Sequence, residues 1–298
     1  MRQVTVTILT PTYNRENTLS ALYQSLVRQT ATGFQWLIVD DGSTDNTEEL
    51  VQSFVDEHKI SIEYHKKKNG GKHTALNYSH PFIQGELLWI VDSDDTVVPS
   101  AVEIIANDWK RFRRDKQVAG ITYLKGSDEY HPLRNFKHSR DEFISDSIEA
   151  HVNVRNVPDA CEVIRTDVFK EIVFPEYEGE RFLGESYMWN QIGYKYKTVY
   201  INKVLYICTY LEGGLTKSGR FLRIQCPLGG MDNSRTYFNK RVVLRQRVKN
   251  AILYDCYGFF AGYSLSRITR TSKDPFATLC IPAGFVLYKF WKSKYQIK

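Results

Sequence analysis

The sequence predicts an α/β protein with a mostly parallel central sheet that is covered by helices. Strand-like and helix-like segments alternate from residue 4 to residue 124, which is the pattern of repeated strand–helix units. The segment Leu87–Val91 is apolar at every position, as in a strand buried on both faces of a parallel sheet. Polar loops directly follow several of the strands, and open sheets of this class bind ligands beyond the carboxyl ends of their strands.

The first half of the chain is expected to contain five strands joined by helices. Val4–Thr10 is rich in β-branched residues, and Pro11 ends this strand because proline cannot continue a central one. Leucines recur at helical spacing within 16–29 and form a stripe that faces the core. Further strands are expected at 34–39, 60–64, 87–91 and 118–124, and further helices at about 45–58, 74–83 and 99–114.

The second half is less regular. Residues 125–157 are polar and irregular, and beyond them we expect a short strand at 160–165 and a helix at 184–194. Two strands are expected within 198–210, joined by a turn at Asn202-Lys203. Residues 211–234 contain five glycines and little periodicity, which predicts a mobile segment, and the basic remainder is expected to be helical.

The composition is that of a soluble globular protein. With 298 residues, of which 42% are hydrophobic and 25% charged, the chain can form one large domain or two small ones. The five cysteines are scattered without a C-x-x-C pair, which favours reduced thiols in the cytoplasm over a disulfide framework or a zinc site. The sequence shows no signal peptide and no run of about 18 apolar residues, the length that a membrane span needs.

The net charge of +6 is unevenly distributed along the chain. Residues 235–298 hold 13 Lys and Arg against two acids, a balance of +11, which leaves 27 basic against 32 acidic residues, or −5, elsewhere. Aromatic residues among these basic ones, around the short apolar run Phe276–Trp291, suit the interface of an anionic membrane leaflet. Nucleic acid is not expected, because no recognition motif accompanies the charge. The alternative is a core helical pair with a solvated basic face.

Three carboxylates follow the apolar strand at Leu87–Val91. Asp92 and Asp94 are two residues apart, so in a tight turn both can reach one small volume. Crowded carboxylates repel one another unless a cation shares the site, and hard oxygen ligands suit Mg²⁺ or Mn²⁺. The alternative is a solvated turn in which Asp95 caps the next helix.

Two more polar loops are expected at the same edge of the sheet. The loop after the first strand carries Thr12, Tyr13 and Asn14, and the loop after the second carries Asp40 and Asp41. A tyrosine ring can cover a nucleobase, a carboxylate can accept the imide N–H of uracil, and a metal on the Asp cluster can hold a diphosphate. Each loop alone is compatible with ordinary turn chemistry, whereas together they indicate a nucleotide site.

Three segments carry a family resemblance: Thr10-Pro-Thr-Tyr-Asn-Arg15, Val39-Asp-Asp-Gly-Ser-Thr-Asp45 and Val91-Asp-Ser-Asp-Asp95. They resemble the N-terminal motifs of family 2 glycosyltransferases of the GT-A fold, a Rossmann-like α/β domain. The match is close over residues 4–124 and loose over 160–210. It implies an inverting transferase that uses a nucleotide-sugar donor, usually a UDP-sugar, and a divalent metal, Mn²⁺ or Mg²⁺.

The resemblance also implies residue roles and a division of the chain. The proline-threonine-tyrosine turn and the aspartate pair would hold the nucleoside, which assigns donor binding to Pro11, Thr12, Tyr13, Asp40 and Asp41. The Asp-x-Asp turn would hold metal, diphosphate and donor sugar, with Asp92 and Ser93 on the donor and Asp92 and Asp94 on the metal. The catalytic domain would span 1–235, with a nucleotide-sugar half at 1–124 and an acceptor half at 125–235, followed by a basic helical region at 236–298.

The chain departs from the family pattern ahead of the Asp-x-Asp strand. Where the family commonly has an arginine facing the diphosphate, this sequence has Leu76. Lys72 lies four residues earlier, on the same face of the expected helix. We expect Lys72, with the backbone of Asn69 and Gly71, to supply the positive charge. The alternative is a solvated basic loop, since Lys66–Lys68 lie close by.

A second departure concerns the catalytic base. The family usually places its base in a Glu-Asp pair that opens a helix of the second half, and here Ser186 stands where the aspartate would be. Serine is a poor base, so the nearest carboxylate, Glu185, is the candidate for taking the proton of the acceptor hydroxyl. Glu180 is the reserve candidate, and the alternative is that Glu185 merely caps the helix.

The sequence thus predicts a metal-dependent, inverting glycosyltransferase of the hexosyl or N-acetylhexosaminyl type. It would move a sugar from a UDP-sugar to a lipid-linked or surface-polysaccharide acceptor, in the cytoplasm and peripherally on the inner face of the plasma membrane. A Rossmann dehydrogenase is disfavoured because no G-x-G-x-x-G follows the first strand. The remaining alternative, which Ser186 favours, is a non-catalytic carbohydrate- or membrane-binding module on a decayed transferase scaffold.

Overall fold

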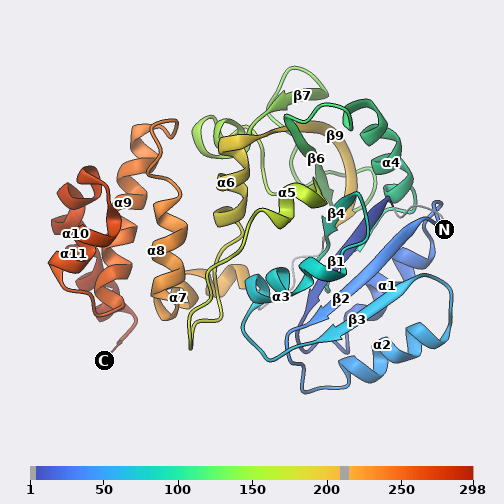
Figure 1. The fold of residues 1–298 in the computed structure, drawn as a ribbon, viewed down its shortest axis with the longest axis horizontal. Helices are drawn as coiled ribbons and strands as arrows, with labels where there is room; N and C mark the ends of the chain where they lie inside the picture. Colours follow the sequence, from blue (N-terminus) through green and yellow to red (C-terminus); the bar gives the residue numbers. More distant parts are fainter. Residues whose placement is uncertain (1–4, 209–214, 298) are drawn as a thin grey trace.

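The computed structural model describes residues 5–208 and 215–297, and it has two parts (Figure 1). One part is a sheet with helices on both faces, and the other is a group of helices at the C-terminal end of the chain. Within the described residues the sheet has nine strands in the order β3-β2-β1-β4-β8-β6-β9-β5, and β7 pairs with β9. The strands are β1 (Val6–Thr12), β2 (Phe34–Asp40), β3 (Ile62–Lys66), β4 (Leu87–Ile90), β5 (Thr96–Val97), β6 (Val118–Gly126), β7 (Glu142–Ser145), β8 (Ala160–Arg165) and β9 (Lys197–Ile207).

The predicted parallel arrangement is present in strands β3, β2, β1 and β4, which all run the same way. β8 is antiparallel to both β4 and β6, and β9 is parallel to β6. All seven residues of β1 and all seven of β2 are buried, because helices cover both faces of the sheet. The α/β fold predicted from the sequence is therefore confirmed.

Helices pack on the sheet in two layers. The first layer is α1 (Leu19–Val27), α2 (Thr47–Asp56) and α4 (Ala101–Phe112), which share a hydrophobic core with Val6, Ile8 and Trp36. The second layer is α3 (Lys72–Ser79), α5 (Thr166–Lys170) and α6 (Ser186–Lys195), which share a core with Leu9, Leu37 and Val39. The helix expected at 74–83 ends at Ser79, and Pro81 lies in a separate 3₁₀ turn, His80–Phe82.

The expected turn at Asn202-Lys203 is wrong, because β9 runs through both residues as one strand. Opposite this point, the pairing between β6 and β9 steps from Thr122↔Tyr200 to Leu124↔Val204. Between these two pairs, one residue of β6 lies opposite three of β9, so the two extra residues form an irregularity in the strand and not a hairpin. The polar stretch 125–157 also contains more structure than expected, namely β7 and a π-helical segment, Ile148–Asn153.

The segment 211–234, which shows little periodicity in the sequence, is helical in its described part and forms α7 (Leu215–Gln225) and α8 (Pro227–Arg235). Residues 211–214 lie outside the described residues. The glycines of α8 serve close packing. A Cβ at Gly229 would come within 2.8 Å of the Phe182 carbonyl, and one at Gly230 within 2.8 Å of the Tyr257 ring. Glycine is thus required here because neighbouring groups touch the helix backbone.

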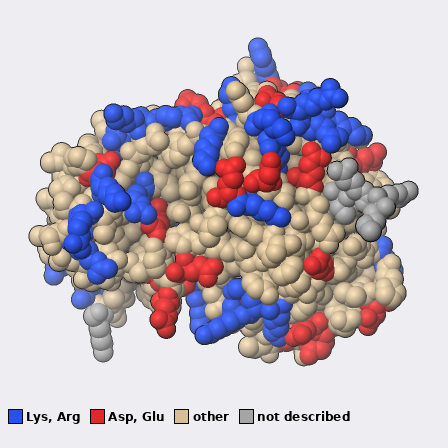
Figure 2. Space-filling model, viewed as in Figure 1, with Lys and Arg blue, Asp and Glu red and all other residues tan. Residues whose placement is uncertain are grey.

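The C-terminal helices are α9 (Leu244–Phe260), α10 (Leu265–Ser272) and α11 (Pro275–Lys294), and they enclose their own hydrophobic core. Met231 of α8 and Ile224 of α7 belong to this core, so the helical group includes residues ahead of position 236. Figure 2 shows more Lys and Arg than Asp and Glu on the face of this helical end. Among the helices of residues 5–208 and 215–297, none is long and apolar enough to cross a membrane.

Candidate active site

The carboxyl ends of β1, β2 and β4 bring the predicted loops to one edge of the sheet, as expected for parallel neighbours. Thr12 is the register partner of Asp40, and the Asp41 N–H donates to the Thr12 carbonyl at 2.8 Å. The turn after β1 is fastened to the turn after β2, since the Asn14 N–H donates to Ser43 Oγ at 2.8 Å. The Tyr13 side chain is 43% exposed at this edge, so one face of its ring is open to a ligand.

Both residues of the aspartate pair are buried and hold neighbouring segments. Asp40 accepts hydrogen bonds from the Tyr64 hydroxyl and from the Ser43 N–H, each at 2.7 Å. Asp41 accepts bonds from Lys67 Nζ at 2.7 Å, from the Gly70 N–H at 2.9 Å and from the Gly71 N–H at 2.6 Å. Asp41 therefore anchors the glycine loop that leads into α3.

Gly71 fits this loop against the segment that precedes α6. Its φ of 94° lies in the left-handed region, and a Cβ on it would come within 2.0 Å of the Arg181 carbonyl oxygen. Because the loop and the 181–185 segment touch here, the first residue of α3, Lys72, lies close to Glu185. The glycine thus permits a contact between residues more than 100 positions apart.

Lys72 joins two of the predicted site carboxylates. Its Nζ lies 2.5 Å from Asp92 Oδ1 and 2.6 Å from Glu185 Oε1. Burial alone would lower the pKa of Lys72, but the two carboxylates outweigh it and raise this pKa above its ordinary value. Although burial disfavours a charged Asp92, the Lys72 ammonium holds the pKa of Asp92 below its usual range. The alternative considered from the sequence, a solvated basic loop, is therefore not the environment of Lys72.

The Asp-x-Asp turn is organised by Tyr206 and Arg15. The Tyr206 hydroxyl accepts the Asp92 N–H at 3.0 Å and donates to Asp95 Oδ2 at 2.7 Å. Burial, with Asp92 and Asp94 close by, raises the pKa of Asp95 to about 6. Arg15 Nε donates to Ser93 Oγ at 3.2 Å, and its Nη2 lies 3.9 Å from Asp94, whose side chain is 32% exposed.

The structure distinguishes the two candidate bases. Glu185 stands at the N-terminal cap position of α6, but its side chain makes no capping hydrogen bond and faces Lys72 in a cavity. Glu180 accepts the N–H groups of Leu228 and Gly229, each at 2.8 Å, at the start of α8. Ser186 donates to Asn233 Oδ1 at 2.9 Å. Glu180 and Ser186 thus fasten α8, and Glu185 is the carboxylate that faces the cavity.

This cavity has a volume of about 900 Å³ and lies against the carboxylate cluster. Sequence reasoning missed several of its polar residues: Thr122, Lys125, Asp159, Glu162 and Tyr206. Glu162 could have been noticed, because a carboxylate interrupts the otherwise apolar strand Ala160–Ile164. Burial raises the pKa of Glu162 to about 8, although Lys125 opposes this shift.

Residues 7–173 match the family described as glycosyl transferase family 2, a segment that contains all three motifs of the nucleotide edge. The chain belongs to glycosyl transferase family 2. The resemblance predicted from the motifs is therefore confirmed.

Two curated relatives of this family member are named as glycosyltransferases. "Glycosyltransferase GlyA" of Streptococcus pneumoniae serotype 4 is 26% identical over 220 residues, which are 71% of this chain and 31% of GlyA. "UDP-Glc:alpha-D-GlcNAc-diphosphoundecaprenol beta-1,3-glucosyltransferase WfgD" of Escherichia coli is 36% identical over 101 residues, 33% of this chain and 38% of WfgD. The chain thus spans less than two fifths of the length of these two relatives.

A solved structure extends the likeness over nearly the whole chain. S. aureus TarS 1–349 in complex with UDP-GlcNAc is similar with a TM-score of 0.62 and 16% identity, covering 97% of this chain and 92% of that one. At this identity the likeness shows the fold, which is GT-A. Most of the helical group α7–α11 therefore lies within the matched share of the chain, since only 3% of the chain remains unmatched.

The sequence predicts only two protein ligands for the metal, Asp92 and Asp94. Within residues 5–208 and 215–297, no group of three or more His, Cys, Asp and Glu side chains is arranged to hold a metal ion. Asp92 and Asp94 lie on one tight turn, in which the Asp95 N–H donates to the Asp92 carbonyl at 3.2 Å. Two carboxylates without further protein ligands are the donor set that Mg²⁺ commonly has when substrate phosphates and water complete its shell.

Proposed function

We propose that this family member is an inverting, metal-dependent glycosyltransferase of the hexosyl or N-acetylhexosaminyl type, with a UDP-sugar as donor and a saccharide as acceptor. The observation that carries the proposal is the Lys72 bridge between Asp92 and Glu185 at the wall of a large cavity. It joins the carboxylate of the donor side to the only predicted base that faces the cavity among the described residues. A donor and an acceptor would meet between these two groups.

The donor would lie along the edge of β1, β2 and β4. Pro11, Thr12 and the open Tyr13 ring would hold the base, with Asp40 behind them. The Thr12 hydroxyl and the Asn69 Oδ1 are buried without a hydrogen-bond partner in the described residues, which supports a polar ligand here. Asp41 would act by holding Gly71 in the loop, and Lys72 would turn from Asp92 to the diphosphate.

The divalent metal, Mn²⁺ or Mg²⁺, would be held by Asp92 and Asp94, with Ser93 between them on the donor. When bound, such a metal neutralises the negative charge that develops on the leaving diphosphate. Arg15 lies 3.9 Å from Asp94, beyond hydrogen-bond distance, so one carboxylate of the pair is free to take another partner. The protein's own contribution is to hold both carboxylates on one turn through Tyr206 and Arg15.

Glu185 would accept the proton of the acceptor hydroxyl. That oxygen forms its bond to the anomeric carbon on the face opposite the diphosphate, the bond from this carbon to the phosphate oxygen breaks, and UDP leaves. A single displacement of this kind inverts the configuration of the sugar. Lys72, at 2.6 Å from Glu185, would orient the carboxylate before the acceptor arrives.

The acceptor would be lipid-linked or part of a surface polysaccharide, consistent with the printed name of WfgD. α11 presents a row of exposed apolar residues, Leu279, Val286 and Phe290, at the spacing of one helix face. Lys289 and Lys294 flank this row, and Lys294 Nζ lies 6.0 Å from the centre of the Phe290 ring. Such a face suits an anionic leaflet, which supports peripheral binding to the cytoplasmic side of the plasma membrane.

The test is a thermal-shift series with UDP, GDP and UDP-sugars, each with Mn²⁺ and with EDTA, followed by a donor-hydrolysis assay. Ligands that bind the native state raise its melting temperature. We expect UDP to stabilise the protein far more with Mn²⁺, and Asp94→Ala to abolish this difference while the protein stays folded. Equal UDP binding with EDTA would remove the metal from the proposal, and UDP binding without any hydrolysis or transfer would favour the non-catalytic module.

A further inference from the structure

The cavity extends beyond Glu185 to a wall made by residues 134–137 and 155–159. The two segments are held side by side, because the Lys137 N–H donates to the Asn156 carbonyl at 2.7 Å. Phe136 is 3% exposed and packs between the two segments and β9, and its N–H donates to Asn202 Oδ1 at 3.2 Å. The wall is therefore fixed to the body of the protein.

Three cations on this wall have no anionic partner among the described residues, and we call them the cationic rim: Arg134, Lys137 and Arg155. Each residue is exposed, and none of the three side chains makes a hydrogen bond or an ion pair within residues 5–208 and 215–297. The other two cavity-lining lysines are paired: Lys72 bridges two carboxylates, which leaves one negative charge in excess, and Lys125 Nζ lies 3.0 Å from Asp159. The three rim cations outweigh that single excess charge. The rim is thus a concentration of unpaired positive charge at the active-site cavity.

The titratable groups on the cavity floor do not cancel this charge. Burial raises the pKa of Glu162 to about 8, so this carboxyl is mostly protonated at neutral pH. Burial lowers the pKa of His151 to about 4, so this ring is neutral there. A ligand that neutralises the rim would therefore have to bring its own negative charge.

The floor of the cavity contains polar groups that lack a hydrogen-bond partner among the described residues. Thr122 is 1% exposed, and its hydroxyl has no hydrogen-bond partner in the part of the chain that the structure describes. The same is true of Asn156 Oδ1. Thr122 is the register partner of Glu162 on β8 and of Tyr200 on β9, so the three side chains form one row across the floor. Such a row suits a ligand with several hydroxyl groups.

We propose that the cationic rim is the phosphate-binding part of the acceptor subsite, and that the acceptor is a saccharide or polyol carrying a phosphate near the hydroxyl that is glycosylated. This inference rests on the proposed function, because it assigns the acceptor side of the same cavity. The two guanidinium groups of the rim can each bind a phosphate through two parallel N–H···O bonds, and Lys137 adds a point charge. The hydroxyls of the acceptor would lie over Thr122 and Glu162.

The experiment is an NMR titration of the full chain saturated with UDP and Mg²⁺, a diamagnetic ion that leaves the signals of the cavity visible, so that the donor site is filled. The probes are N-acetylglucosamine against N-acetylglucosamine 1-phosphate, and glycerol against glycerophosphoglycerol. We expect at least one phosphate-bearing probe to bind about 10-fold or more tightly than its neutral counterpart, through charge-assisted hydrogen bonds. The preference should shrink at about 1 M salt, where the Debye length is roughly 3 Å.

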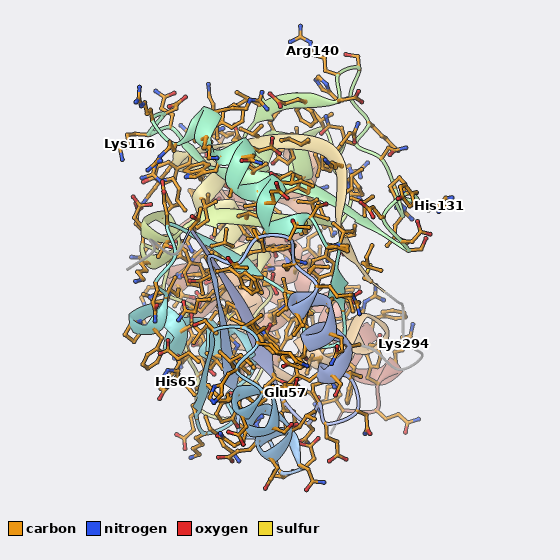
Figure 3. The ribbon with its side chains drawn as sticks, turned by 90° about the vertical axis from the view of Figure 1, so that its right-hand side faces the viewer. Glu57, His65, Lys116, His131, Arg140 and Lys294 are labelled. Atoms are coloured by element: carbon orange, nitrogen blue, oxygen red, sulfur yellow. The ribbon has the colours of Figure 1, made fainter. Side chains whose placement is uncertain are left out.

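The variant Arg134→Gln/Lys137→Gln/Arg155→Asn should lose the preference. Asparagine is chosen at position 155 because the backbone there is left-handed, with φ of 58°, and asparagine tolerates that region. The matched control is Arg140→Gln, a cation of the same segment whose side chain points away from the body of the protein (Figure 3). This control should keep the preference.

A preference for the sugar phosphate assigns the rim to the phosphate that joins a sugar to a lipid carrier, and a preference for the diester assigns it to a polyol-phosphate chain. Either result supports the inference. Equal affinity for charged and neutral probes in the wild type, or a preference that survives in the triple variant, overturns it. Failure of the wild type to bind UDP would overturn the proposed function and this inference together, whereas UDP binding without a phosphate preference would overturn the inference alone.

Discussion

We expect the free energy of unfolding to depend strongly on pH because of one buried carboxyl group, that of Asp255 on α9. Its side chain is 0% exposed, and neither carboxylate oxygen has a hydrogen-bond partner among the described residues. α11 presses against it, since a Cβ on Gly284 would come within 2.4 Å of Asp255 Cβ. Burial raises the pKa of Asp255 from 3.8 to about 7. A carboxylate in this position is costly, because nothing replaces the water that it loses on folding.

The sign and size of the effect follow from this pKa. Between pH 3.8 and about 7 the folded protein keeps a proton that the unfolded chain releases, so stability falls as pH rises through this window and then levels off. At 1.36 kcal/mol for each pH unit, the total is about 4 kcal/mol, of which about 3 kcal/mol lies between pH 4.5 and 7. The thiols of Cys256 and Cys280 lie near Asp255, but burial raises the pKa of each above its ordinary 9.0, so neither titrates in this window.

The perturbation is Asp255→Asn, which keeps the shape and removes the titration. Urea unfolding at pH 4.5 and at pH 8 gives the free energy of unfolding of both proteins. We expect the variant to gain about 3 kcal/mol relative to the wild type between the two pH values, whatever constant cost the buried amide adds. The control is Asp141→Asn at an exposed position, which should leave the pH dependence of the wild type unchanged. A difference between variant and wild type that is the same at both pH values would refute the reasoning, since it would mean that the Asp255 carboxyl titrates as it does in the unfolded chain.

The other predictions concern activity and binding. Glu185→Gln should bind donor nearly as the wild type does and lose roughly 10²–10⁴-fold in kcat, which is the usual contribution of a positioned base. Glu180→Gln should keep its turnover and be less stable, because α8 loses a contact. The reverse result in steady-state kinetics would make Glu180 the base. Lys72→Ala should weaken the binding of UDP by about 10- to 100-fold in calorimetry and leave the binding of uridine nearly unchanged. The reason is that Lys72 would contact only the diphosphate, and a charge-assisted hydrogen bond contributes about 1.5–3 kcal/mol. An equal loss for uridine would show that the loop shapes the base pocket. Sedimentation with liposomes should show that the protein binds anionic but not neutral vesicles, and this binding should be lost at about 1 M salt. The variant Leu279→Ser/Val286→Ser/Phe290→Ser on α11 should bind anionic vesicles more weakly. Binding that does not depend on lipid charge would favour a solvated basic face.

The pattern of apolar and polar residues within short stretches of the sequence was sufficient to predict the sheet and the edge where a nucleotide would bind. The strands could be predicted because an apolar run such as Leu87–Val91 has few alternatives once helices flank it on both sides. The three loops could be assigned to one edge because parallel strands present their carboxyl ends together. The choice of Lys72 came from the family's arginine position combined with helical spacing, and the structure places Lys72 Nζ 2.5 Å from Asp92.

Local pattern failed where glycine or polar residues serve distant contacts. Gly229 and Gly230 lie in a regular helix, and they are glycine because Phe182 and Tyr257 approach the backbone. Asn202 and Lys203 are typical turn residues, but they lie within β9, at the point where the pairing of β9 with β6 is irregular. In each case the deciding neighbour is far away in the sequence, so no short window contains the information.

The sequence by itself determined the fold class, the family and the two carboxylates of the Asp-x-Asp turn, because these depend on periodicity and on short motifs. The tertiary structure alone decided which acid faces the cavity, since Glu180 and Glu185 are five residues apart and differ only in whether α8 or Lys72 reaches them. It also decided that, within the part of the chain that the structure describes, the cations at 134, 137 and 155 are unpaired and Asp255 has no hydrogen-bond partner. Pairing between charged groups depends on distances of a few ångströms across the fold, and these distances are set by how helices and strands pack, not by the order of residues along any one of them.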